Sequence, residues 1–547
     1  MRKGLIIVGG LIVLAAGGVS ALWYAGQPEA RSRFESALQV AAAQGGFEAE
    51  FSDVAMGGFP LAYEAQFQAL SMRNPESRVE IEMPEMAARV SPTNPNTVRL
   101  LFPEEFTVTD NSGEAPTGLK VFSSALVADV TDTGDERGAI AVSAERFAIE
   151  PVSTEGMPEL DALSIAYVNP RISGDFTQRT LENGGDLRFN LTAEALELEA
   201  EATGFEQRSL TLGTGAIDSD ILVDQEVARV ETSYADLTMR SIDSSGALLE
   251  VASGSARVNA VYSGADASQM ALFRAAIGQL LNGEDPNALS QISLDGDAAI
   301  DVTVALEALA ASVTGLSEGG GQTVRWKTDA AGYDLRLQGG QASFNAGTKA
   351  FGLEFVGPLT RAGGVDNMEV SAVYPFRPAA DVQDASIRYA LTGVTMDDTT
   401  WAELNTSGEL DRQIGGLELD LGVGVVIPRD PFLASFDAEP PFDVKTVSIN
   451  SLTLDMLGFS GAATGEIAIE NDVPNGAVRI LLRNWRKLMN GLGSSALFPE
   501  LAPMVGMATI TLESLVVPGE SEEESVLDIE FVGQQVVVNG RPLGEPQ

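Results

Sequence analysis

The sequence predicts a mainly β protein, in which an N-terminal transmembrane helix precedes large, antiparallel, curved β-sheet halves with a few short amphipathic helices. The first observation is an uncharged run from Gly4 to Ala25. The second is that apolar residues recur at every second position from Phe47 onward, as in strands with one wet face. The third is that helical spacing is confined to short segments, so the crossover helices that parallel strands need are missing.

The uncharged N-terminal run is long enough to cross a membrane once. Its 22 residues span about 33 Å as a helix, against a hydrocarbon core of about 30 Å. Two cations precede the run, and Trp23 and Tyr24 close it. The positive-inside rule therefore makes residues 1–27 a cytoplasmic tip and inner-membrane anchor, with the C-terminal bulk in the periplasm. The alternative is a signal peptide cleaved after Val19-Ser20-Ala21, which would release the bulk to the periplasm.

The composition excludes several classes of function. Lys plus Arg is 34 and Asp plus Glu is 78, so the net charge is −44, which argues against nucleic acid and against binding anionic headgroups by charge. The chain has no cysteine and no histidine, which removes thiolate nucleophiles, serine–histidine catalysis and histidine-bound zinc. Asp295-Gly296-Asp297 and Asp397-Asp398 do not match the spacing of a calcium loop. We therefore predict no catalytic residue, no metal, no cofactor and no enzyme activity.

The N-terminal half begins with a short linker helix and continues as strands. Residues 28–45 place Phe34 and Leu38 at helical spacing and end at a glycine pair. Residues 46–262 form the predicted N-terminal β half, which opens with a hairpin whose turn contains Gly58, Phe59 and Pro60. In Leu187, Phe189 and Leu191, the apolar side chains alternate with polar ones, which predicts inward positions of a half-buried sheet.

Residues 263–320 form a predicted helical insertion and linker between the β halves. Ala265 to Gly283 has apolar residues in steps of three and four, including Met270 and Phe273. This amphipathic helix could be a lid on an apolar groove, an element that touches the membrane, or a plug for the open end of a sheet. A strand at 292–304, a brief helix at 305–313 and a glycine-rich linker at 318–321 complete the insertion.

Residues 321–547 form the predicted C-terminal β half, a series of strands with one further helix. That helix, Arg483 to Leu492, is amphipathic, and Arg483, Arg486 and Lys487 gather near Trp485. In so acidic a chain this basic cluster could contact a ligand or a partner, or an acidic patch of the same protein. The strands are predicted at 323–328, 332–338, 342–345, 351–356, 368–374, 386–394, 415–426, 444–456 and 462–470.

Short motifs at both ends resemble a known family. At the N-terminal end, Gly58-Phe59-Pro60 follows an export segment and precedes a proline-asparagine turn and a strand that ends in Phe102-Pro103. At the C-terminal end, Asn484-Trp485 lies in a short helix, and the closing strand finishes in Asn539-Gly540-Arg541-Pro542. This pattern resembles the DUF2125 family of uncharacterised alphaproteobacterial envelope proteins. A looser similarity to AsmA-type envelope proteins implies lipid handling, although this chain is shorter and has no obvious repeat.

Two functional hypotheses follow. The first is an inner-membrane-anchored periplasmic protein that binds lipid or another apolar ligand in envelope maintenance. The second is a non-enzymatic scaffold that binds another envelope protein by a surface or a sheet edge. A groove predicts that inward strand positions line an unfilled channel, whereas a scaffold predicts a closed core. Neither hypothesis involves nucleic acid.

Overall fold

The computed structural model describes residues 30–543, apart from several gaps of one to three residues and the longer segments 112–116, 153–161, 178–185, 202–206, 274–293, 316–321 and 429–441. The predicted anchor, residues 4–25, therefore lies outside the described residues, as does the predicted linker at 318–321. Among the helices that are described, none is long and apolar enough to cross a membrane. The chain forms two compact units, Met1–Ala299 and Ile300–Gln547, whose boundary falls within the segment predicted as an insertion.

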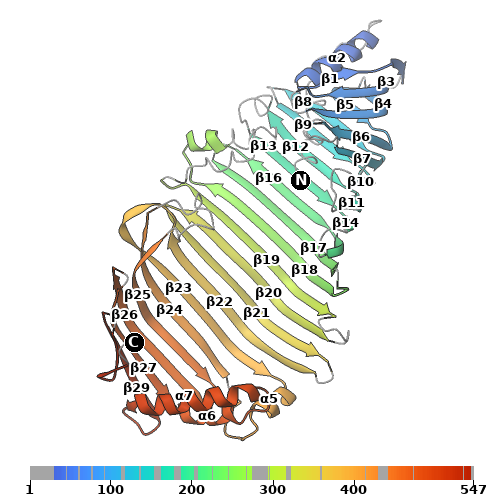
Figure 1. Cartoon of the computed structure of the whole chain (residues 1–547). Coiled ribbons are helices and arrows are strands. Elements are labelled where there is room, and N and C mark those ends of the chain that lie inside the picture. Colours follow the sequence, from blue (N-terminus) through green and yellow to red (C-terminus); the bar gives the residue numbers. More distant parts are fainter. Residues whose placement is uncertain are drawn as a thin grey trace. The chain divides into compact units, whose positions relative to one another are not determined.

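The first unit begins with a helix, which a series of antiparallel strands follows (Figure 1). The helix is α2, Ala30–Gln44, which corresponds to the predicted linker helix. The strands are β1 (Glu48–Glu50), β2 (Asp53–Gly57), β3 (Tyr63–Arg73), β4 (Val79–Ser91), β5 (Asn94–Leu101), β6 (Glu105–Asp110), β7 (Thr117–Ser124), β8 (Val127–Gly134), β9 (Arg137–Ser143), β10 (Arg146–Pro151), β11 (Ala162–Val168), β12 (Arg171–Thr177), β13 (Leu187–Ala193), β14 (Ala195–Glu201), β15 (Gln207–Thr214), β16 (Ile217–Val223), β17 (Val227–Asp243) and β18 (Leu248–Ser263).

These strands form a meander of long strands, many of which are broken in the middle. The first part of β4 pairs with β6 and its last part with β5, so β5 and β6 together make one long strand. The following long strands, as far as β16, are divided into two shorter strands in the same way. Strand β17 is undivided and pairs with both β15 and β16. Several breaks coincide with a residue of positive φ, such as Ala125 at 53° and Asn169 at 47°. All strand pairings among the described residues of the unit are antiparallel, as the sequence predicts.

The breaks keep apolar side chains on one face. In β13 the apolar residues fall at odd positions up to Ala193, and in β14 they fall at even positions from Leu196. Phe189 lies opposite Ile221, and Leu198 lies opposite both Ile165 and Leu212, so apolar residues meet apolar residues on both sides of the break. The step of three residues between the two series allows the strand to bend while one face of the sheet stays apolar.

The apolar face of the first strands is a closed core. Helix α2 contributes Phe34 and Leu38 to it, and Phe67 and Val121 are 1% and 0% exposed. Leu187 and Phe189, two of the residues predicted to line an open channel, pack against the margin of this core instead. Near the end of the unit the structure describes a helix over residues 268–273, within the predicted helix 265–283. Met270 is buried there, and Phe273 stacks on Tyr262 of β18 at 4.7 Å between ring centroids.

The second unit is also a meander, in which β20 to β26 each pair with the next strand and β27 pairs with β29. Three helices, α5 (Asp398–Leu404), α6 (Trp485–Gly493) and α7 (Ala502–Leu515), gather at one end of the strands (Figure 1). The 3₁₀ turn η2 (Pro499–Leu501) precedes α7. The strands are β19 (Ala299–Thr314), β20 (Thr323–Gln338), β21 (Gln341–Val356), β22 (Arg361–Pro375), β23 (Ala379–Met396), β24 (Ile414–Ile427), β25 (Asp443–Met456), β26 (Phe459–Glu470), β27 (Val473–Arg483), β28 (Val517–Pro518), β29 (Glu524–Val532), β30 (Gln535–Val538) and β31 (Arg541–Pro542).

The predicted helix at 305–313 is wrong, because this segment belongs to strand β19. Ala308 has a φ of 51° and divides the strand. Apolar residues lie at even positions up to Leu306 and at odd positions from Leu309. The step of three across Ala308 imitates helical spacing. The sequence also predicted two strands, 323–328 and 332–338, where the structure has the single strand β20.

The three C-terminal helices cover part of the apolar face. Trp485 and Leu488 of α6 and Leu404 of α5 are buried with Leu457 and Phe459. Leu454, Leu482 and Leu512 pack against this group. The sequence predicted α6 but neither α5 nor α7. Asp397, weighed above as a calcium ligand, caps α5 instead, because its side chain accepts a hydrogen bond from the backbone N–H of Thr400.

Candidate functional site

The apolar face of β20 to β24 is the strongest candidate for a binding surface. Cross-strand neighbours follow one another in rows on this face. One row runs through Tyr333, Ala346, Val370, Tyr389 and Leu419, and the next runs through Leu335, Phe344, Ala372, Ile387 and Leu421. We call this surface the open apolar face. The rows arise because the alternation of apolar and polar residues stays in register from strand to strand.

Large side chains on the open apolar face are exposed to solvent. Tyr333, Phe355, Tyr374 and Ile387 are 41%, 49%, 42% and 43% exposed. Within the described residues, no side chain of the two rows defined above is buried. Apolar side chains scattered singly over a surface are ordinary, but a contiguous exposed group usually marks a ligand-binding or interaction site.

Hydroxyl groups stabilise the bend that crosses this face. Thr328 is 4% exposed, and its hydroxyl lies 2.6 Å from the carbonyl oxygen of Lys349 and 2.6 Å from the hydroxyl of Thr348. The contact between the two threonines places residues from both sides of the bend on one face. Lys349 immediately precedes Ala350, whose φ is 53°. The open apolar face is therefore continuous along the strands, and the hydroxyl of Thr328 satisfies the partly buried carbonyl of Lys349 at the bend.

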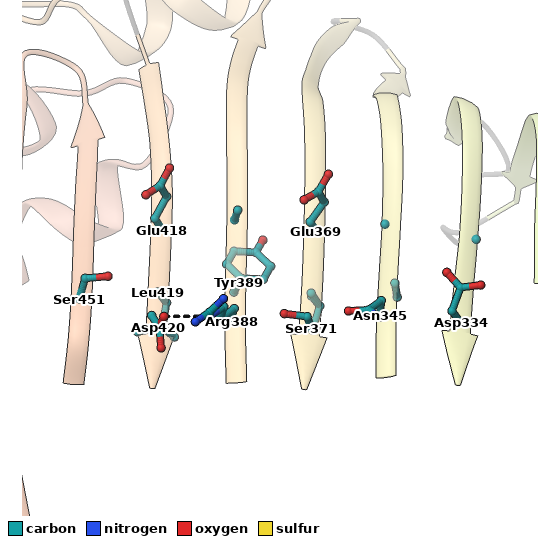
Figure 2. A pocket seen from close by; sticks show the side chains of 15 residues that line it. Asp334, Asn345, Glu369, Ser371, Arg388, Tyr389, Glu418, Leu419, Asp420 and Ser451 are labelled. Atoms are coloured by element: carbon teal, nitrogen blue, oxygen red, sulfur yellow. Dashed lines mark ion pairs between the residues drawn. The ribbon is translucent and has the colours of Figure 1, made fainter. Parts of the chain in front are cut away.

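The opposite face of the same strands carries a polar hollow of about 750 Å³ (Figure 2). Figure 2 shows one row of polar side chains that crosses the sheet, composed of Asp334, Asn345, Ser371, Arg388, Asp420 and Ser451. Arg388 forms an ion pair with Asp420 at 2.8 Å. The neighbouring row contains Gly332, Gly347 and Ala390, and these small residues leave the space that forms the hollow.

The chemistry of the polar hollow gives little basis for a reaction. Its lining contains the carboxylates of Asp334, Glu369, Glu418 and Asp420 and a single cation, Arg388, which Asp420 neutralises. Over the part of the chain that the structure describes, no group of three or more acidic side chains is arranged to hold a metal ion. We therefore regard this hollow as the solvated side of the sheet.

Of the four residues predicted to contact a ligand or partner, Arg483 ends strand β27, whereas Trp485, Arg486 and Lys487 begin α6. Arg483 pairs with Glu524 at 3.0 Å, Arg486 with Glu513 at 3.4 Å, and Lys487 with Asp411 at 3.2 Å. Trp485 is 2% exposed, and its indole N–H donates to the hydroxyl of Ser525 at 3.0 Å. The structure therefore pairs each of these cations with an acid of the same chain. Contact with a ligand stays a prediction.

Glu524 lies at the centre of this cluster. The backbone N–H of Glu520 donates to its carboxylate at 3.1 Å, and this hydrogen bond, followed by that from Arg483, holds the pKa of Glu524 below its usual value. Arg486 also lies 4.6 Å from the centre of the Trp485 ring. These contacts fix α6 to β29 and to α7.

Of the predicted turn motif, only Gly58 lies within the described residues. Its φ of 83° belongs to the left-handed region, and a side chain there would approach the carbonyl oxygen of Ala62 to 2.9 Å. Glycine is therefore required by the turn. Phe59 and Pro60 lie outside the described residues.

Together, these features define a class of protein: a mainly β protein whose long antiparallel meander is closed by a core in one part and leaves an apolar face uncovered in another. Residues 23–281 match the model of the family described as "Uncharacterized protein conserved in bacteria (DUF2125)", the family whose resemblance the sequence motifs indicated. The open apolar face lies C-terminal to the matched residues. The comparisons with curated proteins and with solved structures each gave no match. The similarity to AsmA-type proteins stays a prediction.

Proposed function

We propose that the protein binds the acyl chains of a lipid, or a similar apolar ligand, on the open apolar face. The observation that carries this proposal is that large side chains of neighbouring strands are exposed together on one face. Covering such a face removes apolar surface from water, which is worth about 25 cal/mol for each Å². The two rows contain no charged residue, and the carboxylates and Arg388 that a compact polar ligand would need line the hollow on the opposite face.

The dimensions of the face suit an acyl chain. Five neighbouring strands, β20 to β24, extend about 19 Å across the sheet at about 4.8 Å between strands. One leaflet of a bilayer has an apolar depth of about 15 Å, half of a core of about 30 Å. An acyl chain could therefore lie across the strands without leaving the face.

The proposed location is the periplasmic side of the inner membrane, with residues 4–25 as the anchor. The support is the uncharged run flanked by cations and aromatics. Release to the periplasm after cleavage is the alternative. The N-terminal sequence of the mature protein, with protease protection in spheroplasts, separates the two.

Mass spectrometry of organic extracts tests the lipid-binding proposal. The protein is purified from the cell envelope in mild detergent, and we expect a stoichiometric acyl lipid that a control envelope protein lacks. Ile387→Asp places a charge on the open apolar face and should abolish retention of the lipid. Ser386→Asp is the matched control, because Ser386 faces the opposite side of the same strand.

Lipid retention by both variants would contradict the proposal. A clean extract from the unmodified protein would favour the alternative function, a scaffold that binds another envelope protein. An exposed apolar face also suits that function, and the partner would then protect Ile387 from solvent.

A further inference from the structure

Helix α7 exposes an apolar stripe. Met504, Met507 and Ile510 are 61%, 64% and 71% exposed and follow one another in steps of three along the helix. Phe498 and Leu501, at 41% and 38%, extend the stripe into the preceding turn. The sequence from Leu501 to Leu512 contains no charged residue. An exposed helical surface without charge is unusual in a chain of net charge −44.

The packing of α7 holds this stripe at the surface. Leu512 and Val516 pack against the buried cluster that contains Trp485 and Leu488. Glu513 pairs with Arg486 of α6 at 3.4 Å. Turning the stripe inward would break these contacts, so the exposure of Met507 and Ile510 is a property of the packed cluster.

The polar groups of α7 are satisfied within the helix. The hydroxyls of Thr509 and Thr511 donate to the carbonyl oxygens of Val505 and Met507 at 2.8 and 2.9 Å, and Ser514 donates to Thr511 at 2.7 Å. Hydroxyls bonded to their own helix need no water or partner, as in helices that enter lipid. The surface offered is therefore apolar and contains few polar groups that a bilayer would leave unsatisfied.

We infer that α7 docks on a lipid bilayer and inserts Met504, Met507 and Ile510 among the headgroups. Exposed apolar side chains of a helix bind the membrane interface in this way. The charge distribution favours this occupant, because the ion-paired, locally uncharged surface at α7 meets less repulsion from anionic lipid than the acidic remainder of the chain.

Docking at α7 would also bring the bilayer close to the open apolar face. Leu454 packs against the cluster beneath α7. A row of cross-strand neighbours leads from Leu454 through Leu417, Leu391 and Met368 to the open apolar face. A lipid could then move between bilayer and sheet along an apolar path. This last step rests on the proposed function, whereas docking does not.

Site-specific fluorescence tests the docking. Because the chain has no cysteine, Met507→Cys gives the full-length protein one site for an environment-sensitive fluorophore. Met507 is exposed, so this substitution leaves the buried core unchanged. Asp334→Cys on the polar face of β20 is the control. In vesicles of phosphatidylethanolamine and phosphatidylglycerol with spin-labelled acyl chains, we expect a blue shift and severalfold quenching at residue 507, and neither at residue 334.

Two results would overturn the inference. One is a probe at residue 507 that is quenched no more than the probe at residue 334. The other is energy transfer between labelled copies of Met507→Cys without lipid, which would identify a second copy of the chain as the occupant. If α7 does not dock but the protein retains lipid, this inference fails and the proposed function stands. If α7 docks but the protein retains no lipid, the proposed function fails and this inference stands.

Discussion

The two units are both antiparallel meanders, but the apolar face is covered in the first and exposed in the second. In the first unit, the apolar face of β3 to β8 is filled by its own side chains and by α2, and Phe67 is 1% exposed. In the second unit, the corresponding face of β20 to β24 leaves Ile387 43% exposed. Alternation of apolar and polar residues is equally clean in both. The difference therefore lies in what covers the face, which strand periodicity does not encode.

The largest effect should come from the closed core. Phe67→Ala removes a buried ring that packs edge-on against Phe51 at 5.3 Å. We expect a loss of about 3–5 kcal/mol in the free energy of unfolding of the first unit. Urea denaturation followed by circular dichroism measures it, with Val40→Ala on the exposed side of α2 as the control. A loss below about 1 kcal/mol would mean that the core is not closed in solution.

The next effect should come from the bend in the second unit. Thr328→Val keeps the shape of the side chain and removes the hydroxyl that contacts Lys349 and Thr348. Leaving the buried hydroxyl of Thr348 without this partner costs about 1–3 kcal/mol. Ser386→Ala, partly exposed on the polar face, should cost less than about 0.5 kcal/mol. Equal midpoints in urea for the two variants would show that the hydroxyl does not support the bend.

A smaller effect is expected on the open apolar face. Ile387→Ala removes a side chain that already lies largely in water, so we expect a loss of about 1 kcal/mol or less. Thermal unfolding of the delipidated protein measures it. A loss as large as that of Phe67→Ala would show that something covers this face in solution, and the contrast between the two units would then disappear.

The last effect is limited to a range of pH. The pKa of Glu524 is lowered in the folded protein, chiefly by the N–H of Glu520 and then by Arg483. A lowered pKa means that the carboxylate stabilises the fold above its ordinary, unfolded pKa, and that this contribution is lost as pH falls through the folded value. The difference in melting temperature between the wild type and Glu524→Gln should therefore be present at neutral pH and vanish in acid. A constant difference would assign the effect to packing.

Much of the fold could be predicted, because strand periodicity and turn residues are local signals. The antiparallel strands, α2 and α6 are at or near their predicted residues. The helix wrongly predicted at 305–313 has a physical cause: at Ala308 a strand bends, and the step from Leu306 to Leu309 resembles a helical step. Breaks of this kind can be recognised where two alternating series of opposite parity meet.

The candidate site was harder to predict. Leu187 and Phe189 were expected to line a channel, yet they lie at the margin of the closed core. Tyr333 and Ile387, which are exposed, have the same local pattern. Whether a face is covered depends on segments distant in sequence, such as α2, and no local pattern reports this. Helix α7 was missed because its threonines favour strands and its apolar residues continue on every side.

The meander has a consequence for how such a protein can change size. Because β20 to β26 pair only with their neighbours in sequence, removing or duplicating one hairpin among them leaves every other connection in place. Each hairpin adds about 9–10 Å to the width of the sheet, and the nearest-neighbour contacts make stability roughly a sum over adjacent strands. The width of the apolar surface is therefore set by the number of hairpins in the sheet.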